Sequence, residues 1–414
     1  MRVFLAAIFF CPLIAWAQID SLMIYYRSGA KAYELQDYES FYRAMERANQ
    51  IRPGHPTLTY NLACGAALTG KPALAISVLK DFVLMNALHD FQADSDFISL
   101  RKHAAYQELI RLQQQQLDTI TTSEQVFKIM YQAFHPESIT YYRPTKSYFF
   151  GDVRSRRVMH VTRNGQVDVW VDQQQDMYAV MGIVIDESRQ ELWATTAALP
   201  EMIDHDSTVD GKSSVFVFDL VTKVLKNQWK FDDRLLVGIT QSPDGTILLG
   251  DVKHNHLLKI ENSQQDATVL IDLSDHFMNI QGMTFDQKGS QLYLSDYLTG
   301  IYFLDSNLEL RPIALPDHVS FKGIDGLYWH NGSLYATQNG TRPMRVYKFG
   351  LNAAGDRIID TELLDQSGIL NEPTTGTFTD THFLYIANSP WGAYDKSGNF
   401  EPDRPVIILA QELK

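Results

Sequence analysis

Residues 321–340, FKGIDGLYWHNGSLYATQNG, have the pattern of a β-hairpin. Strand-forming residues stand on both sides of Asn331-Gly332, a dipeptide that favours the tight turn of a two-stranded hairpin. Asp325 comes immediately before Gly326, at the start of the first strand. A carboxylate at this place either bonds the amides of a turn or points at a ligand, so its role depends on the fold around it.

The same pattern recurs along the chain from about residue 125. One small residue marks the inner strand of each copy, and these residues are Ser138, Gly182, Gly238, Gly282, Gly326 and Gly376. They are 44 to 56 residues apart, a spacing typical of four-stranded propeller blades. The sequence therefore predicts an all-β six-bladed propeller over residues 121–414. We expect the strand near Phe127–Ile129 to pair with the C-terminal segment RPVIILAQEL and close the ring, since an open ring would leave an unpaired edge.

Residues 18–120 have apolar residues at helical spacing and predict an all-α domain. The stretches DYESFYRAMERANQIRPGHP (37–56) and YNLACGAALTGKPALAISVLK (60–80) resemble tetratricopeptide repeats. The positions that carry the resemblance are Tyr38, Ala48, Pro53, Leu62, Ala63 and Gly70. Repeats of this kind stack on one another, and the resemblance implies a protein or peptide partner in a concave groove. The alternative is that this domain only packs against the next one.

The N-terminus, MRVFLAAIFFCPLIAWA (1–17), has the layout of a secretory signal peptide. Arg2 precedes an apolar run, and Ala15-Trp16-Ala17 forms a small-x-small cleavage site. We expect a secreted or periplasmic protein that begins near Gln18; the alternative is a membrane anchor, for which the run is short. No other segment is apolar enough to span a bilayer. The net charge of −13 and the lack of a long basic run argue against nucleic acid as a partner.

The innermost strands of propeller blades line a central channel and run in the same direction. The residues just before the six marker positions are therefore expected around the channel mouth, and they are Glu137, Met181, Val237, Gln281, Asp325 and Thr375. Two carboxylates and one amide suit a hard divalent cation, such as Ca²⁺, Mg²⁺, Mn²⁺ or a water-rich Zn²⁺. We predict that Glu137, Gln281 and Asp325 bind one such ion. Thr375 and Asn388 are predicted at the channel rim.

Three stretches resemble motifs of the senescence marker protein / gluconolactonase family of six-bladed propellers, and they are HPESITYY, NIQGMTFDQKGSQLYLSD and IDGLYWHNGSLYAT. The resemblance implies a single divalent metal at the channel mouth, with Glu137 and Asp325 among its ligands. Gln281 stands where the family has Asn, and its side chain is one methylene longer. Val237-Gly238-Ile239 replaces the family's Asn-Asp-Gly substrate motif, so hydrolysis of a sugar lactone is only weakly implied.

Two functions stay open at this stage. In the first, the propeller is a metal-dependent lactonase- or esterase-like hydrolase of a small molecule bound at the channel, and Asp325 or Glu137 accepts a proton. In the second, the chain is a non-catalytic scaffold that binds a protein or ligand with its helical groove and propeller faces. The carboxylates favour the first function. The missing substrate motif and the added helical repeats favour the second.

Three other aspartates end a strand and precede a short turn, and they are Asp152, Asp251 and Asp296. Each would look catalytic if it occurred alone. Their recurrence from blade to blade instead predicts a structural role, in which the carboxylate bonds the amides of the turn.

Overall fold

The computed structural model describes residues 14–395, 398–402 and 404–413. Residues 1–13, which make up most of the predicted signal peptide, lie outside the described residues. The chain forms two compact units. The helical unit comprises the described residues up to Val83 together with His89–Leu112, and the propeller unit comprises Leu84–Leu88 and the chain from Gln113 onward.

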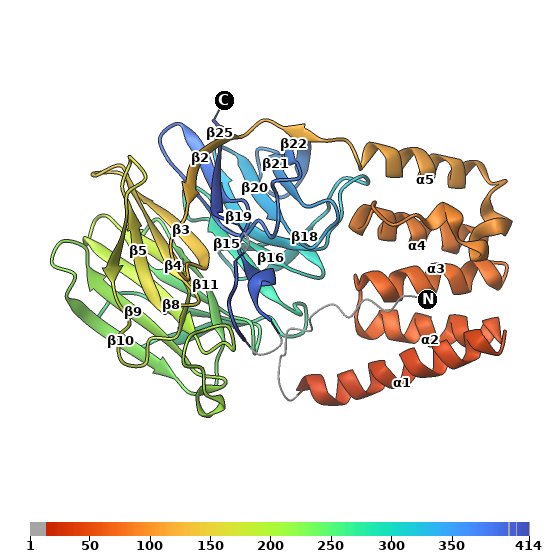
Figure 1. Cartoon of the computed structure of the whole chain (residues 1–414), viewed down its shortest axis with the longest axis horizontal. Helices are drawn as coiled ribbons and strands as arrows, with labels where there is room; N and C mark the ends of the chain where they lie inside the picture. Colours follow the sequence, from red (N-terminus) through yellow and green to blue (C-terminus); the bar gives the residue numbers. More distant parts are fainter. Residues whose placement is uncertain (1–13, 396–397, 403, 414) are drawn as a thin grey trace. The chain divides into compact units, whose positions relative to one another are not determined.

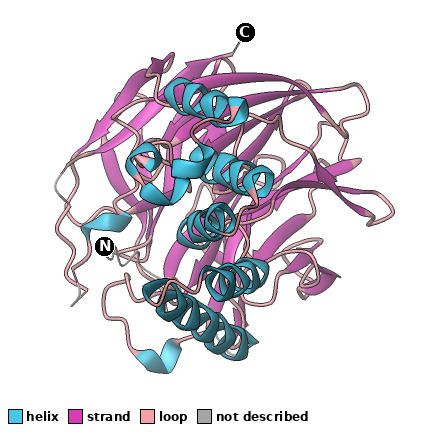
Figure 2. Cartoon of the chain, turned by 90° about the vertical axis from the view of Figure 1, so that its right-hand side faces the viewer, coloured by secondary structure: helices cyan, strands magenta, loops and turns pink. Residues whose placement is uncertain are grey.

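The helical unit consists of α-helices joined by short turns and two short 3-10 helices, coloured cyan in Figure 2. These elements are α1 (Ile14–Glu34), α2 (Tyr38–Ile51), α3 (Pro56–Leu68), α4 (Pro72–Met85, whose last residues belong to the propeller unit), η1 (Phe91–Ala93), η2 (Ser95–Leu100) and α5 (Ala104–Gln115). Asp37 caps α2 by accepting a hydrogen bond from the amide of Ser40, and Pro56 begins α3 at the position where a missing N–H is tolerated. None of the described helices is long and apolar enough to cross a membrane.

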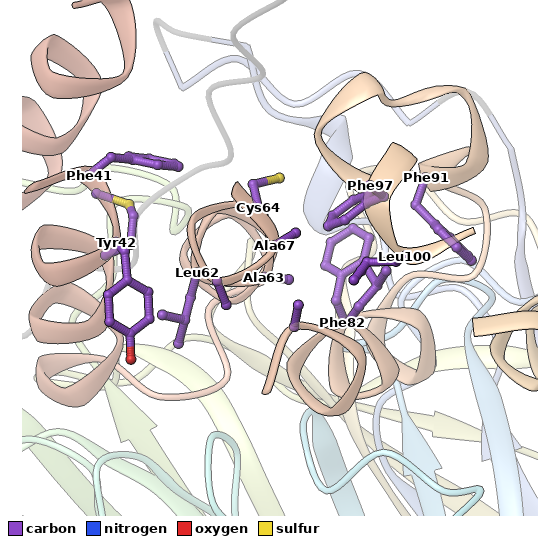
Figure 3. Packing of buried hydrophobic residues seen from close by; sticks show 14 of the residues in the cluster. Phe41, Tyr42, Leu62, Ala63, Cys64, Ala67, Phe82, Phe91, Phe97 and Leu100 are labelled. Carbon is purple, nitrogen blue, oxygen red and sulfur yellow. The ribbon is translucent and has the colours of Figure 1, made fainter. Parts of the chain in front are cut away.

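The core of the helical unit is built around α3 (Figure 3). Phe41 and Tyr42 of α2 lie on one side of this helix, while Phe82 and Phe97 lie on the other. Small residues dominate α3, and they let its neighbours approach closely. The expected helical domain is therefore present, whereas its assignment to the tetratricopeptide repeats stays a prediction.

The propeller unit contains six antiparallel sheets, whose strands are labelled in Figure 1 where there is room. Blade one consists of β3 (Pro136–Tyr142), β4 (Ser147–Asp152), β5 (Arg157–Val161) and β6 (Val167–Val171). Blade two consists of β7 (Ala179–Asp186), β8 (Glu191–Ala197), β9 (Ser213–Asp219) and β10 (Leu225–Phe231). Blade three consists of β11 (Leu236–Gln241), β12 (Ile247–Asp251), β13 (His256–Ile260) and β14 (Thr268–Asp272). Blade four consists of β15 (Ile280–Phe285), β16 (Gln291–Asp296), β17 (Gly300–Asp305) and β18 (Leu310–Ile313). Blade five consists of β19 (Ile324–His330), β20 (Ser333–Gln338), β21 (Arg345–Leu351) and β22 (Ile358–Gln366). Blade six consists of β23 (Gly376–Phe378), β24 (His382–Ile386), β25 (Val406–Glu412) and β2 (Glu124–Ile129). The predicted fold, a six-bladed propeller that follows N-terminal helices, is confirmed.

The ring is closed by an early strand, as the sequence predicted. β2 is the outermost strand of blade six and pairs with β25, with Phe127 opposite Ile408 and Ile129 opposite Val406. The two-residue strand β1 (Ile120–Thr121), which was not expected, pairs with the outer strand β22 of blade five. The segment that enters the propeller therefore joins its last two blades, and the edge of β25 is not left open.

In blades two to five, the marker glycine is required by the close approach of the backbone of the next blade. A Cβ on Gly182 would lie 3.0 Å from the carbonyl oxygen of Val237 in the next blade, and one on Gly238 would lie 3.1 Å from that of Gln281. A Cβ on Gly282 would lie 2.6 Å from the amide nitrogen of Leu327 and 2.8 Å from the carbonyl oxygen of Asp325. The repeated glycine thus follows from the packing of one blade against the next.

We expect Gly282→Ala to lower the free energy of unfolding by about 1–3 kcal/mol, because backbone atoms of blade five cannot move away from the added methyl group. Urea denaturation of the full chain measures this change. Gly368→Ala is the matched control, since a Cβ there meets nothing within 4 Å. Equal stabilities of the two variants would contradict this account of the motif glycine.

Candidate functional site

The predicted channel-mouth residues share one backbone feature. In blades one to five, the pairing of the inner strand with its neighbour slips at the residue that precedes the marker position. The residues skipped in this way include Glu137, Met181, Val237, Gln281 and Asp325. A β-bulge of this kind redirects a side chain out of the regular alternation of the strand. In blade six, Thr375 immediately precedes β23, and its hydroxyl donates to the carbonyl oxygen of Glu137 at 2.8 Å.

Glu137 lies near the start of β3 and is buried, with 9% of its surface exposed. Its Oε2 accepts hydrogen bonds from the hydroxyl of Ser389 at 3.1 Å and from Nε1 of Trp391 at 2.8 Å. Burial, followed by the negative charge of Asp325, raises the pKa of Glu137 well above its ordinary value. The carboxylate is therefore held in place by two neutral donors.

Asp325 lies near the start of β19, and the hairpin turn at Asn331-Gly332 follows the other end of this strand. Its Oδ2 accepts a hydrogen bond from Nδ2 of Asn339 at 2.5 Å, and Oδ1 of Asn339 accepts one from the hydroxyl of Tyr297 at 2.9 Å. Burial raises the pKa of Asp325 to about 7, against the opposing effect of the Asn339 hydrogen bond. The side chain thus bonds an amide of the site and not the amides of a turn.

The other predicted residues have different surroundings. Nε2 of Gln281 donates to Oδ1 of Asn279 at 3.0 Å. Asn388 uses both ends of its amide on backbone groups: Nδ2 donates to the carbonyl oxygen of Pro405 at 2.9 Å, and Oδ1 accepts from the amide of Ile407 at 2.6 Å. The structure therefore gives Asn388 a role in holding the start of β25, while its place at the channel rim stays a prediction.

Three further residues of the site were not predicted. Asn339 follows β20, Trp391 begins the short helix η4 (Trp391–Ala393), and Glu372 lies in the loop between β22 and β23. Oε1 of Glu372 lies 3.4 Å from a guanidinium nitrogen of Arg342, and its charge raises the pKa of both Glu137 and Asp325. Trp391 belongs to a stretch, ANSPWGAYD, that is conspicuously aromatic and polar, whereas no local signal distinguishes Glu372.

Met181 and Val237, the two apolar residues among the predicted mouth positions, have apolar surroundings. Met181 belongs to a hydrophobic cluster with Leu199 and Met202, which lie in the long connection between β8 and β9, and Val237 packs against this cluster. Trp391, the donor to Glu137, packs against the same cluster. Trp391 therefore connects the carboxylate of Glu137 to an apolar wall that contains residues of blades two and three.

The residues present fit a hard divalent cation. Within the described part of the chain, Oε1 of Glu137, Oδ1 of Asp325 and Oε1 of Gln281 accept no hydrogen bond, although the other end of each side chain is fixed. Among the described residues, neither carboxylate pairs with a cationic side chain, and burial raises the pKa of both. Oxygen donors in a set of this kind are those that Ca²⁺, Mg²⁺ and Mn²⁺ prefer.

One other group of donors is close-packed. Among the described residues, the ligand atoms of Cys64, Asp94 and Asp96 in the helical unit lie within 4.8 Å of one another. Tyr60 donates to Asp94 at 2.6 Å and Tyr33 donates to Asp96 at 3.1 Å, so both carboxylates are already bonded. Cys64 is 3% exposed and lies in the core of the helical unit.

Comparison with solved structures shows the same fold in other proteins. A gluconolactonase from Xanthomonas campestris superposes with a TM-score of 0.50 and 14% identity, covering 71% of this chain and 91% of that one. A calcium-binding protein, regucalcin from Agrobacterium tumefaciens, gives a TM-score of 0.50 and 13% identity, covering 72% of this chain and 97% of that one. No protein-family model matches the chain, and no curated protein matches it in sequence. The resemblance in fold that the sequence motifs predicted is therefore confirmed, and at these identities it is a likeness of fold alone.

The raised pKa of Asp325 predicts that the metal-free protein loses stability as the pH rises. Because this pKa is about 7 in the folded chain against an ordinary value of 3.8, the folded state binds the proton more tightly than the unfolded state. The resulting stabilisation is complete below pH 3.8 and is lost as the pH rises through 7. We expect the free energy of unfolding in chelator to fall between about pH 4 and pH 7, and Asp325→Asn to flatten this fall. Equal pH profiles for the two proteins would contradict the assignment.

Proposed function

We propose that the propeller is a metal-dependent hydrolase of a lactone or an ester. The observation that carries this proposal is the pair of carboxylates, Glu137 and Asp325, which lie at equivalent inner-strand bulges and have no cationic partner within the described residues. Two carboxylates whose charges disfavour each other would be stabilised together by a divalent cation. Glu137, Gln281 and Asp325 would hold this ion.

The chain's own residues have separate tasks in this proposal. A bound cation would polarise a carbonyl group and lower the pKa of a water molecule. Ser389 and Trp391 orient Glu137, while Asn339 orients Asp325. Asp325 or Glu137 would accept a proton from an attacking water and return it to the leaving oxygen. The apolar wall with Met181 and Val237 suits the hydrocarbon part of a substrate.

The proposal is tested on the full chain after chelation. Ca²⁺, Mg²⁺, Mn²⁺ and Zn²⁺ are added one at a time, and both the unfolding temperature and the hydrolysis of a panel of lactones and aryl esters are measured. The proposal requires that one ion raises the unfolding temperature and also switches on hydrolysis. An ion that stabilises the protein without any hydrolysis would favour the scaffold function, and no response to any ion would exclude the metal centre.

A further inference from the structure

Glu372 has a backbone conformation that a glutamate rarely adopts. It lies in the loop between β22 and β23 with φ at +59°, in the left-handed region. A residue with a Cβ in this region costs roughly 1–2 kcal/mol relative to the right-handed region, and glycine avoids this cost. Such a conformation persists where the surrounding structure holds it, and it is often found at functional sites.

The loop is held from both sides. The amide of Glu372 lies 2.9 Å from the sulfur of Met344, and its carbonyl oxygen accepts a hydrogen bond from the amide of Ser389 at 3.0 Å. The preceding amide, of Asn371, donates to the carbonyl oxygen of Ala387 at 2.9 Å. The backbone of Glu372 is therefore fixed against blade six, and its side chain has a defined origin.

Glu372 is linked through one residue to each side of the carboxylate pair. Ser389, which binds the carbonyl oxygen of Glu372, also donates to Oε2 of Glu137. Arg342, which pairs with the carboxylate of Glu372, also donates to the carbonyl oxygen of Asn339, the residue that binds Asp325. The ligand atoms of the three acidic side chains do not all lie within 4.8 Å of one another, so Glu372 does not form a tight triad with the other two.

Arg342 is itself anchored within the propeller unit. Its amide donates to the carbonyl oxygen of Met85 at 2.8 Å, and its carbonyl oxygen accepts from the amide of Ala87 at 2.8 Å. One guanidinium nitrogen bonds the carbonyl oxygens of Asn339 and Thr341, each at 2.8 Å. The positive charge beside Glu372 is thus committed to a fixed position.

We propose that Glu372 is a third acidic residue of the channel mouth, a positioning residue that raises the affinity of the site for a divalent cation without occupying a ligand position. The proposal rests on the proposed function. In this proposal, the strained backbone of Glu372 is retained because the glutamate side chain is needed at this position of the loop. A glycine there would fold more easily, so the sequence keeps glutamate for its charge.

The test separates charge from strain. Glu372→Gly removes both, and we expect an unfolding temperature in chelator that is equal to or above that of the wild type, with the dissociation constant for the activating ion about 10-fold higher or more. Glu372→Gln keeps the strain and the shape but removes the charge, and we expect the same loss of affinity. Leu308→Gly is the matched control, because Leu308 has a φ of +63° in an exposed turn of blade four. We expect the control to leave the affinity unchanged.

Isothermal titration with Ca²⁺, Mg²⁺ or Mn²⁺ alone provides the affinity, and thermal unfolding provides the stability. A wild-type protein that binds no ion overturns the proposed function, and this inference with it. If the wild type binds an ion and both Glu372 variants bind it equally well, only the inference is overturned. If Glu372→Gly does not fold, Glu372→Gln decides, since its backbone is unchanged.

Discussion

Replacing Asp325 with alanine is expected to abolish the stabilisation that a divalent cation gives to the folded chain. An ion that binds only the folded state at a hundredfold excess over its dissociation constant stabilises that state by about 2.7 kcal/mol. Asp325 supplies one of two carboxylates at the mouth, and its Oδ1 has no competing hydrogen bond within the described residues. Without it, the remaining carboxylate and amide would bind the ion far more weakly. Thermal unfolding with and without the ion measures the increment.

The effect on the metal-free protein should be in the opposite direction. At pH 8 the buried carboxylate of Asp325 is charged although burial disfavours that charge, so its removal relieves an unfavourable interaction with Glu137. Asp325→Ala is therefore expected to keep or raise the unfolding temperature in chelator while it loses the response to the ion. A general loss of structure could not produce this combination.

Two controls limit the interpretation. Asp286→Ala removes a carboxylate that bonds the amides of Ser290 and Gln291 in an exposed turn, so it should leave the ion's increment intact. Gln281→Asn should preserve ion binding, because an amide oxygen remains on the same strand. If Asp325→Ala keeps the full increment, the ion binds elsewhere and the assignment of the site is wrong.

The fold could be predicted largely because the propeller repeats itself. The marker glycines of blades two to five are each required by backbone atoms of the next blade, so the same requirement recurs along the sequence. Gly376 is instead crowded by Leu384 and Phe383 of its own blade, and Ser138 takes the equivalent place in blade one. The closing strand was predictable because an unpaired edge is unfavourable and Phe127–Ile129 has strand-forming residues. β1 was missed because two residues carry no pattern, and only the neighbouring blade defines them as a strand.

The site could be predicted only where it follows the repeat. Glu137, Gln281 and Asp325 occupy the same bulge on three blades, so their equivalence is visible in the sequence. Asn339 and Glu372 lie in connections whose lengths differ between blades, and no alignment of repeats brings them together. Asn388 lies in such a connection as well, and its amide is engaged with the backbone of Pro405 and Ile407, partners that only the return of the chain into β25 provides.

The predicted structural role of the three strand-ending aspartates is confirmed by their hydrogen bonds. Asp152 accepts from the amides of His135 and Ser155, and Asp251 accepts from those of Leu235 and Lys253. Each carboxylate thereby connects the entry of its blade's inner strand to the turn that follows the second strand. The same arrangement occurs in blade three, whose mouth residue is apolar, so it does not depend on a ligand.

Asp296 has the largest number of such bonds, and its replacement by alanine is expected to have the largest effect on stability. It is fully buried, and its two oxygens accept from the amides of Met278, Asn279, Leu298 and Thr299 at 2.5 to 2.9 Å. A buried amide left without a partner costs about 1–3 kcal/mol, and water could reach only some of the four. We expect Asp296→Ala to lower the free energy of unfolding by at least about 3 kcal/mol, measured by urea denaturation in chelator.

Two further variants test whether the loss of stability in Asp296→Ala comes from its hydrogen bonds, and the outcome also bears on Asp325. Asp296→Asn keeps one acceptor oxygen and should lose roughly half as much stability, while Asp305→Ala, at an exposed turn with two accepted amides, should lose less than about 1 kcal/mol. A small loss for Asp296→Ala would show that recurrence does not identify structural carboxylates. That outcome would also weaken the case for Asp325, because Asp325 was assigned to the channel mouth by the same comparison of equivalent positions from blade to blade. Asp296 accepts a hydrogen bond from the backbone amide of Asn279, whose side chain in turn accepts one from the side-chain amide of Gln281. Losing the first bond would therefore also alter the position of Gln281 at the predicted channel mouth.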